Sequence, residues 1–188
     1  MSSWKYLKRA HNRRHLQRSK FNFRAASVEE NYVYGAMGPG NSDNEVCKWI
    51  EFMQQQGIKR VCCLLNSELH TYESDLLASY RHQFGEEALL WVPFNDYDLT
   101  NDSEVLLIEE VLPFLADSVS KKEPVVVHCV AGSSRTGIVL AAWLVYGWSM
   151  TNQQALETVL NLGGNPVVAG GKPQLNSLLN ACRVAANS

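Results

Sequence analysis

The sequence has no stretch of 18 apolar residues, and its N-terminus has no apolar core like that of a signal peptide. Internal repeats and low-complexity segments are also absent. With 46% hydrophobic and 19% charged residues among 188, the composition is that of a globular domain with a sizeable core. These features argue against a membrane-spanning or fibrous protein, and we expect a cytoplasmic one.

Zinc-type cysteine spacing is missing as well. The sequence has five cysteines, an odd number, and it contains no pair of CxxC motifs. They are Cys47, Cys62, Cys63, Cys129 and Cys182. We expect free thiols rather than disulfides or a zinc site. Packing is the simplest role for four of them. Cys129 differs, because it ends an apolar segment just before a loop of small residues.

Acidic side chains are absent from the first 24 residues. This segment contains eight basic side chains, whereas the remaining chain has 9 basic and 19 acidic ones. The basic residues are Lys5, Lys8, Arg9, Arg13, Arg14, Arg18, Lys20 and Arg24. We therefore divide the chain into a basic N-terminal arm, residues 1–24, and a domain of residues 25–188. The arm either docks on the acidic domain or contacts an anionic membrane or another polyanion.

Within the domain, strand-like apolar segments alternate with segments of helical periodicity. The strand-like segments are 32–34, 58–65, 89–94 and 124–129. The helical segments are about 43–57, 71–84, a pattern from about 101 that Pro113 should kink or divide, 136–146, 152–162 and 173–185. Strands joined by helices predict an α/β fold with a mostly parallel central sheet flanked by helices.

The segment VVVHCVAGSSRTG, residues 125–137, carries the strongest chemical signal. Ligands gather at the carboxyl ends of parallel strands, where Cys129 is expected. The small residues that follow let several backbone N–H groups converge on one anion, next to a helix N-terminus. Arg135 adds a planar cation that can hold two phosphate oxygens. This positive field favours a Cys129 thiolate, which can attack phosphorus and form a cysteinyl-phosphate.

The motif HCVAGSSRTG resembles the signature loop of protein-tyrosine phosphatases, and the order of elements over about residues 28–186 resembles the compact dual-specificity branch. The resemblance implies a two-step hydrolysis of phosphate monoesters without a metal or other cofactor. It makes Cys129 the nucleophile and Arg135 the phosphate clamp, while His128 orders the loop and the Thr136 hydroxyl assists the sulfur. The backbone N–H groups of Val130, Ala131, Gly132, Ser133, Ser134 and Arg135 would form the phosphate cradle.

The same reaction needs a proton donor, which this family supplies from an aspartate on a separate loop. Asp96 lies three residues after Pro93, as in the compact phosphatases, and is our first candidate. Asp98 and Asp102 remain alternatives, although Asp102 also suits a helix cap. Asn165 and Gln174 could line the site or position water, or simply belong to a glycine-rich connection and the start of the last helix.

The five loop residues from Val130 to Ser134 include no lysine, unlike phosphoinositide-specific members that resemble this chain. We therefore expect a phosphorylated protein as the partner, with phosphotyrosine as substrate, alone or together with phosphoserine and phosphothreonine. The alternatives are a phosphoinositide phosphatase, an RNA 5'-triphosphatase, an arsenate reductase, or a weakly active module that only binds phosphorylated partners.

Overall fold

A five-stranded sheet forms the centre of the structure, a computed structural model that describes residues 19–94, 101–166 and 171–187. Its strands are β1 (Arg24–Ala25), β2 (Val33–Met37), β3 (Arg60–Cys63), β4 (Leu89–Trp91) and β5 (Val125–Cys129). The spatial order is β1-β2-β5-β3-β4, in which only β1 runs antiparallel to its neighbour. The predicted mostly parallel α/β sheet is thus confirmed. Strand β1 was not predicted, because two residues are too short to show a pattern.

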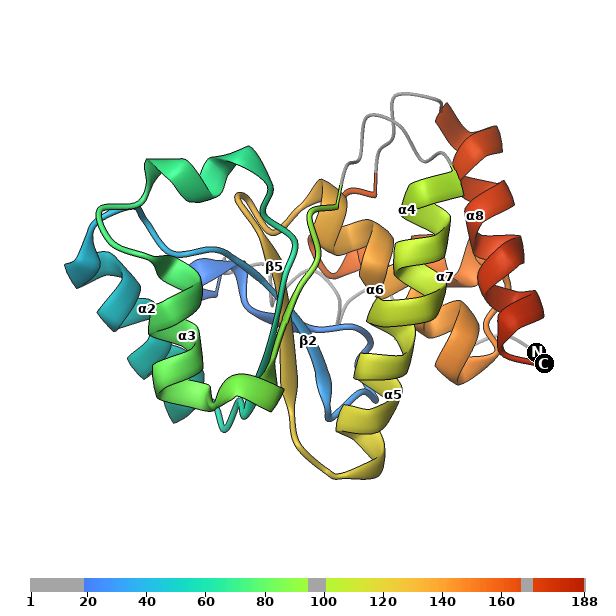
Figure 1. The fold of residues 1–188 in the computed structure, drawn as a ribbon. Coiled ribbons are helices and arrows are strands. Elements are labelled where there is room, and N and C mark those ends of the chain that lie inside the picture. The colour runs from blue at the N-terminus through green and yellow to red at the C-terminus, as the bar shows by residue number, and fades with distance from the viewer. Residues whose placement is uncertain (1–18, 95–100, 167–170, 188) are drawn as a thin grey trace.

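Helices cover both faces of the sheet (Figure 1). On one face lie α2 (Asp43–Gln55) and α3 (Leu76–Phe84). On the other lie α4 (Asn101–Leu106), α5 (Leu112–Ser120), α6 (Ser134–Trp148), α7 (Asn152–Asn161) and α8 (Gly171–Ala185). Four short helical segments connect these elements: η1 (Lys20–Asn22), η2 (Ser67–Thr71), η3 (Glu86–Ala88) and η4 (Leu107–Val111). Among the described residues, no helix is long and apolar enough to span a membrane.

The central strand β5 is buried on both faces and alternates between two cores. Val125, Val127 and Cys129 pack in the core beneath α6, whereas Val126 packs in the core beneath α2 and α3. His128 follows Val126 and contacts the rings of Trp49 and Tyr80. Adjacent side chains of a strand point to opposite faces. His128 and Cys129 therefore lie on opposite sides of the sheet, although they are neighbours in sequence.

The expected division of the third helix occurs before Pro113 rather than at it. The segment η4 is a π-type turn, and α5 starts at Leu112 with Pro113 in its first turn. The backbone stays helical on both sides of the boundary, at Leu106 and Leu112. Proline has no N–H to donate and its ring crowds the preceding turn, so the wider π turn accommodates it without ending the helix.

Two other helix starts show how capping decides a boundary. Ser42 caps α2, and its side chain and that of Glu45 form a reciprocal capping box. The helix predicted from about residue 71 instead begins at Leu76, because Asp75 accepts a hydrogen bond from the N–H of Ala78. Thr71 belongs to the preceding short segment η2.

The buried Glu30 anchors the connection between β1 and β2 to α6. Its side-chain oxygens accept hydrogen bonds from the indole N–H groups of Trp143 (2.8 Å) and Trp148 (2.9 Å) and from the backbone N–H groups of Asn31 and Tyr32. The carboxylate is 6% exposed and surrounded by donors. Burial of a carboxylate is tolerated here because these hydrogen bonds replace its hydration.

Candidate active site

The loop between β5 and α6 lies at the carboxyl end of the central strand, where a parallel sheet binds its ligands. Cys129 is the last residue of β5, and α6 starts only five residues later, at Ser134. Gly132 has a φ of +64°, and a Cβ there would lie 2.4 Å from the backbone of Ala36. Only glycine fits both the left-handed conformation and this close approach to the end of β2.

Groups outside the loop hold its carbonyl oxygens. The N–H of Gly38 donates to the carbonyls of Cys129 (2.8 Å) and Val130 (3.2 Å). The carbonyl of Ser133 accepts hydrogen bonds from Gly137 (2.9 Å) and Asn165 (3.3 Å). In a trans peptide the N–H points away from the preceding carbonyl. Fixing the carbonyls outward therefore turns N–H groups of the loop inward, as an oxyanion cradle requires.

The Cys129 side chain lies at the base of this loop and is 3% exposed. The Thr136 hydroxyl, fully buried in the first turn of α6, lies 3.2 Å from the Cys129 sulfur as a hydrogen-bond donor. A sulfur that accepts a hydrogen bond is stabilised in its thiolate form. The contact thus places Thr136 where the sequence analysis expected it, beside the sulfur.

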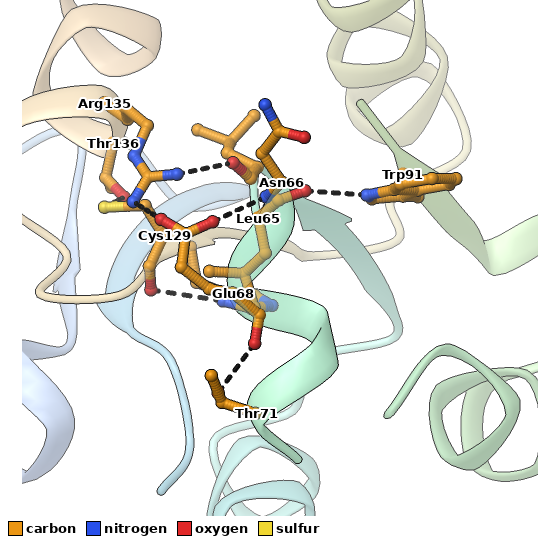
Figure 2. Close-up of polar contacts among 10 residues, drawn as sticks. Leu65, Asn66, Glu68, Thr71, Trp91, Cys129, Arg135 and Thr136 are labelled. Atoms are coloured by element: carbon orange, nitrogen blue, oxygen red, sulfur yellow. Dashed lines mark hydrogen bonds and ion pairs between the residues drawn. The ribbon is translucent and has the colours of Figure 1, made fainter. Parts of the chain in front are cut away.

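Arg135 lies between the loop and the end of β3 (Figure 2). One of its terminal nitrogens donates to the carbonyl of Leu64 (3.1 Å) and the other to a carboxylate oxygen of Glu68 (2.6 Å). The backbone N–H of Asn66 donates to the second oxygen of Glu68 at 2.8 Å. Burial acts to raise the pKa of Glu68, but the hydrogen bonds from Arg135 and Asn66 outweigh it and lower this pKa. Glu68 is therefore an ionised, oriented partner for Arg135.

His128 is fully buried beneath the loop. Its Nδ1 lies 3.4 Å from the Cys129 carbonyl, which can only accept, so this nitrogen carries the proton. Its Nε2 then accepts from the hydroxyl of Tyr80 at 3.1 Å. Burial, aided by the nearby Arg135 cation, lowers the pKa of His128 to about 4. His128 is thus a neutral residue that orders the end of β5 at physiological pH.

Glu68 and Tyr80 were not identified from the sequence. Glu68 follows the carboxyl end of β3, the same sheet edge that presents Cys129, so the strand order would have pointed to it. Tyr80 offers no such signal, because its position matches that of an ordinary core residue of α3.

Asp102 is the one candidate proton donor that lies within the described residues. Asp96 and Asp98 lie outside the described residues. Asp102 is exposed in the first turn of α4, where a carboxylate interacts favourably with the helix dipole. Gln174 is half-buried near the start of α8, and Asn165 contacts the loop through its backbone N–H.

The remaining cysteines are free thiols with distinct surroundings. Burial raises the pKa of Cys63 to about 12 and that of Cys182 to about 12, and it also raises the pKa of Cys62. These three side chains are core residues, as expected. Cys47 is exposed on α2, so the packing role expected for it is wrong. Within the described ranges, no cluster of three or more His, Cys, Asp or Glu side chains could hold a metal ion.

A family model, described as the catalytic domain of dual specificity phosphatases, matches residues 42–176. The chain belongs to this family. The match covers α2 to the start of α8 and includes the whole loop from Cys129 to Arg135. This dual specificity phosphatase domain is a cysteine-dependent phosphatase domain, in agreement with the resemblance of its signature loop.

Curated relatives match shorter parts of the chain. An uncharacterized protein of Methanocaldococcus jannaschii is 43% identical over 54 residues, 29% of this chain and 32% of the relative. An Arabidopsis thaliana protein named phosphatidylinositol 3,4,5-trisphosphate 3-phosphatase and protein-tyrosine-phosphatase PTEN1 is 41% identical over 66 residues, 35% of this chain and 15% of that protein. The chain thus matches less than a third of the length of either.

Solved structures share the fold at low identity. The active form of Tk-PTP has a TM-score of 0.62 at 20% identity, covering 82% of this chain and 93% of the other. PTPMT1 has a TM-score of 0.64 at 14% identity, covering 88% and 96%. A human tyrosine phosphatase-like serine/threonine/tyrosine-interacting protein has a TM-score of 0.62 at 16% identity, covering 83% and 93%.

Proposed function

We propose that the domain hydrolyses phosphotyrosine in proteins, alone or together with phosphoserine and phosphothreonine. The observation that carries the proposal is the arrangement of Cys129, Thr136 and Arg135 around one loop, with Arg135 oriented by Glu68. The loop residues from Val130 to Ser134 supply backbone donors but no cation. A single phosphate group suits such a cradle better than an inositol ring with several phosphates.

In the first step the Cys129 thiolate attacks phosphorus opposite the leaving oxygen. The S–P bond forms while the P–O bond between phosphorus and the leaving group breaks. The proton donor, for which Asp96 is our first candidate, gives its proton to the leaving oxygen. Arg135 and the backbone N–H groups stabilise the negative charge on the transferred group. In the second step water attacks phosphorus and gives a proton to the aspartate. The S–P bond then breaks, which releases inorganic phosphate and restores the thiolate, stabilised by Thr136.

Hydrolysis of para-nitrophenyl phosphate and of a phosphotyrosine peptide by the purified protein tests the proposal. We expect Cys129→Ser to remove activity toward both substrates, because a serine hydroxyl is a much weaker nucleophile than a thiolate. Wild-type activity no greater than that of Cys129→Ser would refute the enzymatic function. Tight binding of the phosphopeptide with no turnover would instead identify a binding module.

Asp96 is the proposed proton donor, on the basis of its spacing from Pro93. In Asp96→Asn, hydrolysis of phenyl phosphate, which has a poor leaving group, should slow much more than hydrolysis of para-nitrophenyl phosphate. Asp98→Asn is the matched control and should slow both substrates equally or not at all. The opposite pattern would assign the acid to Asp98.

A phosphoinositide is the second candidate substrate, supported by the seven basic side chains of residues 1–20 and by the name of the Arabidopsis relative. A panel of phosphopeptides, soluble phosphoinositides and triphosphate-ended RNA compares the candidates through kcat/KM. The highest kcat/KM for phosphotyrosine peptides is the expected result. Preference for a phosphoinositide or for RNA would replace our first candidate.

We further propose a cytoplasmic location, in which the basic arm contacts anionic surfaces. Free cysteines and the charge of the arm support this proposal. Binding to vesicles that contain phosphatidylserine should fall in the double variant Arg13→Glu/Arg14→Glu. It should persist in the matched control Arg13→Lys/Arg14→Lys, which retains the charge. Equal binding by both variants would argue against an electrostatic contact.

A further inference from the structure

Arg24 connects the edge strand β1 to the phosphate-binding loop. One terminal nitrogen of Arg24 donates to the carbonyl of Gly132 at 2.7 Å, across 108 residues of sequence. The side-chain amide of Asn22 also donates to this oxygen, at 3.4 Å. Backbone N–H groups hold the carbonyls of Cys129, Val130 and Ser133, whereas these two side chains hold that of Gly132. Arg24 therefore contributes to the contacts that orient the loop.

The contact between Arg24 and the Gly132 carbonyl fixes the orientation of the peptide group between Gly132 and Ser133. The carbonyl of Gly132 and the N–H of Ser133 belong to the same planar unit and point to opposite sides. Glycine has few steric restrictions, so this peptide could rotate and turn the carbonyl oxygen toward the phosphate. A carbonyl oxygen there would repel the dianion, whereas the N–H attracts it. Holding the Gly132 carbonyl outward thus preserves a donor in the cradle.

The charge of Arg24 is not neutralised by a carboxylate in the described ranges, where none of the ion pairs includes it. Its Nε is buried and has no hydrogen-bond partner among the described residues. Burial lowers the pKa of Arg24, while the negative charge of the Cys129 thiolate acts to raise it. The cation therefore adds to the positive field around the sulfur and the bound phosphate.

The local backbone is shaped to hold Arg24. Phe21 and Asn22 both have left-handed φ angles, +58° and +51°. Asparagine tolerates this conformation, but it is unfavourable for a bulky residue such as Phe21. This conformation lets the carbonyl of Asn22 accept from the second terminal nitrogen of Arg24 at 2.9 Å. On the other side, a Cβ at Gly164 would lie 3.1 Å from that guanidinium. Backbone strain that persists beside a functional loop suggests a role beyond packing.

We propose that Arg24 is a positioning residue that locks the Gly132–Ser133 peptide with its N–H directed at the substrate phosphate. The inference rests on the proposed phosphatase function. It assigns catalytic importance to a residue of the edge strand, outside the signature loop and outside the matched family segment that begins at residue 42.

Binding of orthovanadate, a phosphate analogue, tests whether Arg24 fixes the orientation of the Gly132–Ser133 peptide, and it does so without requiring turnover. We expect Arg24→Gln to raise the Kd for orthovanadate by about tenfold or more, because a donor in the cradle and a nearby charge are lost. Arg24→Lys, which retains the charge, should recover part of this loss. In amide NMR spectra, the Ser133 signal should shift on adding orthovanadate to the wild type and should not shift in Arg24→Gln.

Arg183→Gln is the matched control. Arg183 also holds a backbone carbonyl, that of Met150, at 3.0 Å, but at the far end of α6 from the loop. We expect this variant to lose stability while its Kd for orthovanadate stays unchanged. If Arg24→Gln does not fold, Asn22→Ala and Arg24→Lys provide the comparison, with a smaller loss of affinity expected in each.

An unchanged Kd and an unchanged Ser133 shift in folded Arg24 variants would overturn the proposal, even if their thermal stability fell. A wild-type protein that binds orthovanadate but hydrolyses no phosphate ester would contradict the proposed function alone. Failure of the wild type to bind orthovanadate would overturn both.

Discussion

The buried His128 should make folding stability depend on pH in a way that one substitution removes. Its pKa in the folded protein is about 4, against an ordinary value of 6.5, because burial disfavours the charged ring. Between these two values the unfolded chain binds a proton that the folded protein does not. Stability therefore rises with pH across this window and falls as the solution is acidified.

The magnitude follows from the size of the shift. Each pH unit within the window changes the free energy of unfolding by about 1.4 kcal/mol for one proton. The wild type should therefore lose about 2 kcal/mol from this residue between pH 7.5 and pH 5. That loss is a large fraction of a typical domain stability of about 5–15 kcal/mol. The imidazole of His128 contacts the Tyr80 hydroxyl and the Trp49 ring, and the nearby charge is the Arg135 cation. None of these groups is a carboxylate, which would stabilise a proton on the imidazole.

Urea unfolding, followed by tryptophan fluorescence at several pH values between 5 and 7.5, measures this dependence. In His128→Gln and His128→Asn the pH slope should be smaller by about 2 kcal/mol over the interval. Carboxylates such as Glu68 also contribute to acid sensitivity, but their contribution is common to all three proteins and cancels in the comparison. The same slope in wild type and variants would refute the assignment of a neutral, buried His128.

Three further predictions concern other contacts. Glu68→Gln should lower kcat/KM by about tenfold, since it removes the charge from the partner of Arg135; unchanged kinetics would assign Glu68 a purely structural role. Iodoacetate at pH 6 should alkylate Cys129 and inactivate the enzyme, with protection by phosphate, while mass spectrometry finds the buried Cys63 unmodified; equal labelling of both would contradict a selective thiolate. Glu30→Ala should lower the free energy of unfolding by about 3 kcal/mol, because two indole N–H groups lose their acceptor, and a loss below about 0.5 kcal/mol would show that water replaces it.

The local chemistry of the loop could be predicted from the sequence because it depends on residues that are close together in the chain. Apolar residues leading into Cys129, small residues after it and Arg135 six positions later require only a strand, a turn and a helix. The alternation of strand and helix patterns likewise predicts a parallel sheet. Boundaries were less accurate where capping or proline geometry decides them, as at Asp75 and Pro113.

The partners of the loop were decided by tertiary structure. Glu68 is 67 residues from Arg135, Tyr80 is 48 residues from His128, and Arg24 is 108 residues from Gly132. These pairs form because the order β1-β2-β5-β3-β4 brings the ends of β2 and β3 to either side of β5. A hydrophobic pattern shows that a strand exists but not which strands are neighbours. The sequence alone thus determined which residues can do the chemistry, and only the packed sheet determined which side chains orient them.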